Sequence, residues 1–93
     1  MSSTLSLGAG TVSVTDTAAS QSLGWSFKNG YILNAGSVTA IVYPNLSAVD
    51  ATQAIYIPAG VSVSFDDIEI GAIQSFLHKT ASSTTTLYYN FQN

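Results

Sequence analysis

The sequence predicts an all-β fold: a small antiparallel β-sandwich or barrel of about seven to eight short strands. Large apolar and short polar side chains alternate at residues 55–57, 61–65 and 68–70, the period of two that a strand with one buried face requires. Pro58-Ala59-Gly60 lies between the first two runs and marks a turn. Further runs of this kind recur every 8–12 residues or so, which is typical of sandwiches and barrels.

The remaining strands follow from the same alternation and from β-branched or aromatic residues. We expect them at residues 11–15, 23–27, 31–33, 37–43 and 84–91. Residues 44–52 form the longest expected loop, and residues 71–79 fit either a short helical turn or a bulged strand. The chain is therefore expected to be one domain over residues 11–93, preceded by a flexible arm of residues 1–10.

Two local expectations concern residues 23–34. Asn29-Gly30 lies between two strand-like runs, and this pair is the strongest short hairpin signal because both residues accept the positive φ of a type I′ turn. Trp25 and Phe27 alternate with small residues on one side of their strand. We therefore expect both aromatic side chains in the core.

Charge is unusually scarce. Only 8% of the 93 residues are charged, there is no arginine, and Lys28 and Lys79 are the only lysines, whereas soluble domains average about 25% charged residues. Fourteen serines and ten threonines take their place, and hydroxyl groups cost less to desolvate than charged groups. Such a surface is suited to being covered by other protein, although an ordinary Ser/Thr-rich β domain remains the alternative. The net charge of −3 argues against nucleic-acid binding, and no apolar run reaches the ~20 residues that span a membrane.

The sequence offers no catalytic set of residues. His78 is the single histidine, without an evident partner for acid–base or metal chemistry, and we expect it at the surface or on an edge strand. Asp66, Asp67 and Glu69 could contribute to a Ca²⁺ site, but three carboxylates are too few and a solvated face is favoured. We therefore predict no enzyme activity, no cofactor and no metal. Asn45-Leu46-Ser47 matches the acceptor pattern for N-linked glycosylation, and we treat this match as chance.

Contact residues are expected in two places. Successive side chains along a strand point to opposite faces (their parity), which places Tyr56 and Tyr88 on the side opposite to their apolar neighbours. That side is the outside of a sandwich. The arm could add a strand to the sheet edge of a partner; a frayed terminus is the alternative. Its candidate contact residues are Ser2, Ser3, Thr4, Leu5, Ser6 and Leu7.

The C-terminal half resembles small virion proteins of tailed bacteriophages, among them head-decoration and fibre-associated β-sandwiches. The resemblance is carried by the run from Ile57 through Pro58-Ala59-Gly60 to Asp66, by the isoleucine-rich segment after it, and by Thr84-Thr85-Thr86-Leu87-Tyr88-Tyr89. It covers about residues 53–91. No functional residue transfers, because such proteins act through broad surfaces.

The resemblance implies a capsid decoration (cement) protein, made in the host cytoplasm and bound to the outside of the phage head. It would bind the major capsid protein or other virion subunits, commonly as a homotrimer, and would stabilise the shell by bridging capsomers. The alternatives are a receptor- or carbohydrate-binding module of a head or tail fibre, which would use exposed tyrosines, and an accessory subunit of the tail or baseplate.

Overall fold

The computed structural model describes residues 8–66 and 72–92. These residues form eight strands and one turn of 3₁₀ helix, Ala51–Gln53. The strands are β1 (Gly8–Val14), β2 (Ala19–Phe27), β3 (Asn29–Asn34), β4 (Ala40–Pro44), β5 (Ile55–Ile57), β6 (Ser62–Phe65), β7 (Ile73–Thr80) and β8 (Thr85–Gln92). The all-β prediction is confirmed.

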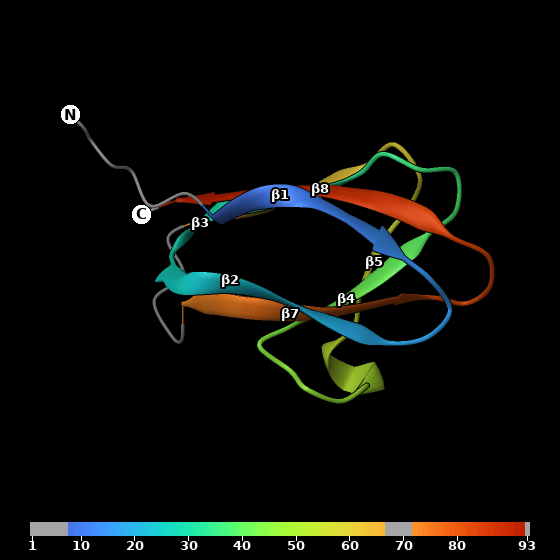
Figure 1. The fold of residues 1–93 in the computed structure, drawn as a ribbon, viewed down its shortest axis with the longest axis horizontal. Coiled ribbons are helices and arrows are strands. Elements are labelled where there is room, and N and C mark those ends of the chain that lie inside the picture. Colours follow the sequence, from blue (N-terminus) through green and yellow to red (C-terminus); the bar gives the residue numbers. More distant parts are fainter. Residues whose placement is uncertain (1–7, 67–71, 93) are drawn as a thin grey trace.

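The strands form two antiparallel sheets of four that pack face to face, so the fold is a sandwich (Figure 1). One sheet, called here the β1 sheet, has the order β1-β8-β3-β6, and the other, the β2 sheet, has the order β2-β7-β4-β5. The strands thus fall into opposed pairs: β1 with β2, β8 with β7, β3 with β4 and β6 with β5. Eight strands wound in this way are a jelly roll, an architecture used by viral capsid domains, lectin domains and cupins.

The core lies between the sheets and is built by the alternation seen in the sequence. Strand β8 shows the pattern most clearly, because Leu87, Tyr89 and Phe91 are buried while Tyr88 is exposed. The ring centroids of Phe27 and Phe91, which lie in opposite sheets, are 6.5 Å apart. Burying an aromatic side chain of this kind stabilises the fold by about 1.5–3 kcal/mol, so this small core depends heavily on its few rings.

The turns explain where the strands end. Pro58 O accepts a hydrogen bond from Val61 N at 3.0 Å, and Gly60 has a φ of 79°. Together they make a type II turn, which requires positive φ at its third residue. The predicted turn at residues 58–60 is confirmed, and it carries the chain from β5 in one sheet to β6 in the other.

Several element boundaries differ from the sequence-based expectations. Strand β1 begins at Gly8, so residues 8–10 belong to the sheet and not to an arm; residues 1–7 lie outside the described residues. Residues 73–80 are the strand β7, which decides between the two alternatives for residues 71–79. The strand expected at residues 68–70 also lies outside the described residues.

The hairpin predicted at Asn29-Gly30 is wrong. β2 ends at Phe27 and β3 begins at Asn29, but the two strands belong to different sheets. Gly30 pairs with Phe91 of β8 and Phe65 of β6, and a Cβ at this position would collide with the Asn90 carbonyl oxygen and the Phe91 ring. Glycine is therefore needed here for close packing of neighbouring chains, a reason that local sequence alone does not reveal.

The prediction that Trp25 lies in the core is also wrong, whereas Phe27 is fully buried as expected. The indole of Trp25 is 65% exposed. Regular pairing of β2 with β7 stops at Ser22 and resumes at Phe27, and Gly24 between them has a φ of 84°. This bulge breaks the alternation, so Trp25 does not share the buried side of Leu23 and Phe27.

Candidate contact surface

The outer face of the β1 sheet crosses four strands and is not covered by any other described element. Strand register places its outward side chains in rows that cross all four strands. Thr11, Tyr88, Leu33 and Ser62 form one row, and Ala9, Asn90, Tyr31 and Ser64 form the next. Ser13 and Thr86 begin a third row. We call this set the uncharged face, because none of its members carries a charge.

The charged residues of the described part of the chain all lie elsewhere. They occupy the connections between strands or the outer side of the β2 sheet. They are Asp16, Lys28, Asp50, Asp66 and Lys79. The few described charged residues are therefore all absent from one sheet face. That face presents only hydroxyl, amide, aliphatic and phenol groups.

Two tyrosines stand at the middle of the uncharged face. Tyr88 is 48% exposed and Tyr31 is 42% exposed. Tyr88 lies opposite Leu33, and Tyr31 lies opposite Asn90, so the two rings are diagonal neighbours on adjacent strands, within reach of one another. Tyrosine combines a large apolar ring with a hydrogen-bonding hydroxyl and is enriched at protein interfaces.

The outer face of the β2 sheet has a different character. Ile41, Tyr43 and Leu77 point outward from its central strands but are buried under the β4–β5 connection, from which Leu46 and Ala54 pack against them. Burial raises the pKa of the Tyr43 hydroxyl, and nearby Tyr56 raises it further. Part of this face is thus already covered by the chain itself.

The sequence-based candidates are distributed over both sheets. The predicted outward orientation of Tyr56 and Tyr88 is confirmed, with Tyr56 62% exposed on the edge strand β5 of the β2 sheet. The structure therefore does not bring these two residues together. Ser2, Ser3, Thr4, Leu5, Ser6 and Leu7 lie outside the described residues, and their contact role stays a prediction.

Sequence reasoning missed Tyr31 and Trp25 as exposed aromatic groups. Tyr31 could have been found by parity, because it alternates with Ile32, whose side chain enters the core. Trp25 could not, because its exposure depends on the bulge at Gly24.

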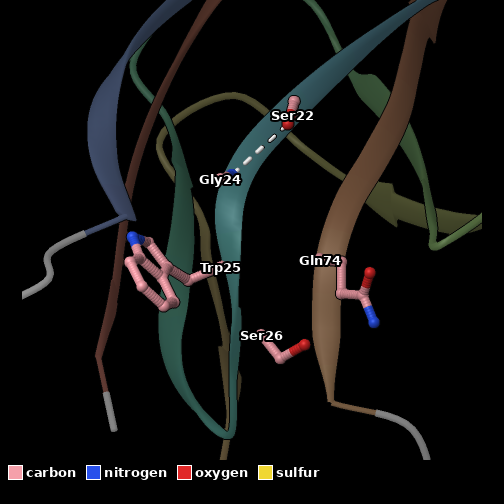
Figure 2. A pocket seen from close by; sticks show the side chains of 5 residues that line it. All are labelled: Ser22, Gly24, Trp25, Ser26 and Gln74. Carbon is pink, nitrogen blue, oxygen red and sulfur yellow. Dashed lines mark hydrogen bonds between the residues drawn. The ribbon is translucent and has the colours of Figure 1, made fainter.

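An open pocket of about 340 Å³ marks the place where the bulge separates β2 from β7 (Figure 2). It is lined by Ser22, Gly24, Trp25, Ser26 and Gln74. Figure 2 shows the indole of Trp25 directed away from Ser26 and Gln74, on the other side of β2. The aromatic ring and these two polar side chains therefore lie on opposite sides of β2 and do not form one shared binding wall.

His78 lies in the core, so the expectation of a surface or edge position is wrong. It is 3% exposed on β7, a central strand that pairs with both β2 and β4. Its ring centroid is 5.9 Å from that of Phe76, and its Nδ1 has no hydrogen-bond partner among the described residues. Burial lowers the pKa of His78, so the imidazole is held in its neutral form.

The described acidic residues do not form a metal site. Asp50 accepts hydrogen bonds from Thr52 N and Oγ1 at 3.0 and 2.7 Å and caps the 3₁₀ turn, and these bonds lower its pKa. In the described residues no group of three or more His, Cys, Asp or Glu could hold a metal ion. Asp67 and Glu69 of the acidic cluster lie outside them.

Comparison with known proteins supports the fold alone. No family model matches the chain, and no curated protein matches it. Among solved structures it is similar to the ethanolamine utilization protein EutQ of Salmonella typhimurium LT2, with a TM-score of 0.54 and 14% identity over 94% of this chain and 58% of that one. EutQ of Clostridium difficile superposes with a TM-score of 0.51 and 12% identity, over 92% and 56%.

The chain thus spans less than two thirds of the length of either EutQ protein. At this level of identity the likeness concerns the backbone: a small β-sandwich. Among the described residues, no helix has the length and hydrophobicity that a membrane span requires.

Proposed function

We propose that this chain is a non-enzymatic structural subunit that binds another protein through the uncharged face of its β1 sheet. The observation that carries the proposal is the absence of charge, among the described residues, from a face that crosses four strands and holds Tyr31 and Tyr88 at its middle. Protein interfaces are depleted of charged residues at their centre and enriched in tyrosine. Hydroxyl and amide groups on such a face are desolvated at modest cost, provided that the partner supplies hydrogen bonds.

The setting we propose is the outside of a tailed-phage head, with the chain acting as a decoration subunit that bridges capsomers. Support comes from the resemblance of residues 53–91 to phage virion proteins and from the jelly roll, which also occurs in viral capsid domains. The fold by itself does not fix a function. The uncharged face adds the physical means: a specific interface needs an extended surface, about 800 Å² from each partner, and this face crosses four strands.

The non-enzymatic part of the proposal is supported by the position of His78. General acid–base catalysis needs a proton carrier within reach of substrate, and this imidazole is enclosed in the core between strands. The described carboxylates Asp16, Asp50 and Asp66 lie in three different connections, so they form no pair of the kind that hydrolases use.

Binding to heads tests the proposed function. The recombinant full chain is added to phage heads that lack it, and bound protein is measured after sedimentation. We expect saturable binding by the wild type in many copies per head. Tyr88→Lys should abolish binding, because it places an unpaired ammonium group in the middle of the interface. Tyr56→Lys, a matched change at an exposed tyrosine outside the uncharged face, should bind as the wild type does. Absence of the protein from purified particles, or equal loss by both variants, would refute the proposal.

A second candidate function, a receptor- or carbohydrate-binding module of a fibre, is favoured by the exposure of Trp25 and Tyr56. Exposed aromatic rings are suited to stacking against sugars. A fibre module should bind glycans or host cells as the isolated chain and should be present in few copies per particle. Glycan binding that is lost in Trp25→Ala, without any binding to heads, would favour this function over decoration. An accessory role in the tail or baseplate would place the chain in tail fractions instead.

A further inference from the structure

The four edge strands of the sandwich are protected to very different degrees. An exposed edge offers unpaired backbone groups to other chains, and proteins guard edges with bulges, short strands, proline or charge. β2 is interrupted by the bulge at Gly24. β5 has three residues and is followed by Pro58, and β6 has four residues and is followed by Asp66.

β1 has none of these protections. It is seven residues long, contains no charged residue and no proline, and pairs with β8 in unbroken register from Gly8 to Val14. Residues 2–7, which precede it in the sequence, add neither charge nor proline. Its outward side chains, Ala9, Thr11 and Ser13, are small, so another strand could approach closely along the whole edge.

The same edge of the sandwich carries the most exposed aromatic residue of the described chain. β1 and β2 end their respective sheets and follow one another through a short connection, so they flank one edge, as Figure 1 shows. Trp25 lies on β2 and is 65% exposed. Tryptophan is the residue type most enriched at the energetic centres of protein interfaces.

We propose that a second copy of this chain occupies this edge, with β1 pairing antiparallel to β1 of the other copy across a twofold axis. Antiparallel pairing of a strand with itself is what a twofold axis generates, and it makes the interface self-complementary. The two β1 sheets then join into one sheet of eight strands. The small uncharged side chains of β1 bring no like charges together, and Trp25 of each copy covers the flank of the joint.

The dimer would join the uncharged faces of two copies into one surface. Only the use of that joined surface for binding to a capsid rests on the proposed function; the pairing of β1 does not. Pairing of this kind gives a twofold dimer in place of the trimer that the family resemblance implies.

Sedimentation equilibrium of the full chain and four variants tests the dimer. The variants at the proposed edge are Thr11→Lys and Trp25→Ala, and their matched controls at the opposite edge are Ser64→Lys and Tyr56→Ala. We expect a dimer for the wild type and both controls. Each edge variant should raise the dissociation constant at least about tenfold, the effect of losing one important contact. Urea unfolding of each variant shows whether it remains folded.

Trp25 is the only tryptophan, so its fluorescence gives a second measurement. On dilution of the wild type, emission should shift to longer wavelength as the indole becomes exposed to water. Thr11→Lys should emit at the longer wavelength at every concentration. A wild-type chain that is monomeric or trimeric, or a dimer weakened equally by Thr11→Lys and Ser64→Lys, would overturn the proposal.

The two proposals fail in different ways. Loss of head binding in Tyr88→Lys with the dimer retained supports the proposed function and leaves the β1 pairing intact. Retention of head binding in a monomeric Trp25→Ala variant, which leaves the uncharged face unaltered, would show that the joined surface is not needed for binding, while the dimer itself would stand.

Discussion

Asn34 is a buried amide at the end of β3 whose hydrogen bonds join both sheets. Its Nδ2 donates to the carbonyl oxygens of Val38 at 2.7 Å and Ile57 at 2.8 Å. Its Oδ1 accepts from Gly36 N at 3.1 Å and from Thr85 Oγ1 at 2.7 Å. Ile57 ends β5 in the β2 sheet, and Thr85 begins β8 in the β1 sheet. All the hydrogen-bonding capacity of the side chain is therefore used at one place.

Replacing Asn34 by alanine should destabilise the fold strongly. The change leaves four polar groups of the protein without their partner in a buried site, and we expect the free energy of unfolding to fall by about 2–4 kcal/mol. Urea denaturation followed by circular dichroism measures the change. The control is Asn90→Ala on the uncharged face, which should cost less than about 0.5 kcal/mol; equal costs would contradict the role given to Asn34.

His78 makes stability depend on pH. Because burial lowers its pKa in the folded chain below the ordinary value of about 6.5, the unfolded chain takes up a proton first as the pH falls. The His78 contribution to the free energy of unfolding should therefore be fully present above about pH 6.5, and it should decrease below that until the folded-state pKa is reached. The range to measure is pH 7.5 to about 5.5, which brackets the ordinary pKa of a histidine side chain.

Urea titrations at several pH values, carried out on the wild type and on His78→Phe, test this dependence. Phenylalanine has a similar size and does not titrate, so the variant should show a nearly flat profile over the same range. An unchanged pH slope in His78→Phe would assign the dependence to another group.

At the scale of the element, the bulge in β2 decides which side chains of that strand reach the core. Gly24 has a φ of 84°, and a Cβ there would meet no atom within 4 Å. The cost of substitution is therefore the cost of the backbone conformation, about 1–2 kcal/mol for an ordinary L-residue. Asparagine tolerates this conformation better than β-branched residues do.

We expect Gly24→Val to lower the free energy of unfolding by at least about 1–2 kcal/mol, and Gly24→Asn to lower it by less. Urea denaturation gives both values. If valine and asparagine were equally well tolerated, β2 would have to be regular in solution, and Trp25 would then face the core as parity first indicated.

Asn45 shows how a single residue can extend a strand. Its φ is 61°, and its Oδ1 accepts hydrogen bonds from Gln74 N and Ser75 N at 2.8 and 3.4 Å, while its Nδ2 donates to Ala72 O at 3.0 Å. The side chain thus continues the β4–β7 ladder just past Pro44. The Asn45 side-chain amide is thus already hydrogen-bonded within the protein, which agrees with treating the glycosylation match at Asn45 as chance.

At the scale of the whole molecule, the segregation of charge should govern how the chain associates. The uncharged face and the β1 edge contain no charged residue among those described. Association through either should therefore depend little on ionic strength, because salt screens charge interactions and leaves apolar and hydrogen-bonded contacts largely unaffected.

The measurement is the dimer dissociation constant, and separately the binding to heads, at about 0.05 and about 0.5 M salt. We expect each to change by less than about threefold between these conditions. A large weakening at high salt would show that charged residues outside the described face and edge dominate the contact.

Prediction from the sequence succeeded where local pattern and burial coincide. β8 and the two strands around Pro58-Ala59-Gly60 were found because apolar alternation and turn chemistry point to the same structure there. It failed at Asn29-Gly30 and Trp25, where a strand crosses between sheets or a bulge shifts the alternation. Both failures have the same origin: the constraint comes from β7 and β8, which are more than forty residues away in the chain.

The sequence by itself determined the class of the fold, the turns that proline and glycine impose, and the low charge of the surface, because each of these follows from neighbouring residues. Only the tertiary structure decided which strands pair, that the described charge-free residues gather on one face, and that His78 is enclosed. It also decided that β1 is an edge strand without bulge, proline or charge. These depend on contacts between distant strands, and a jelly roll makes most of its strand pairs between such segments.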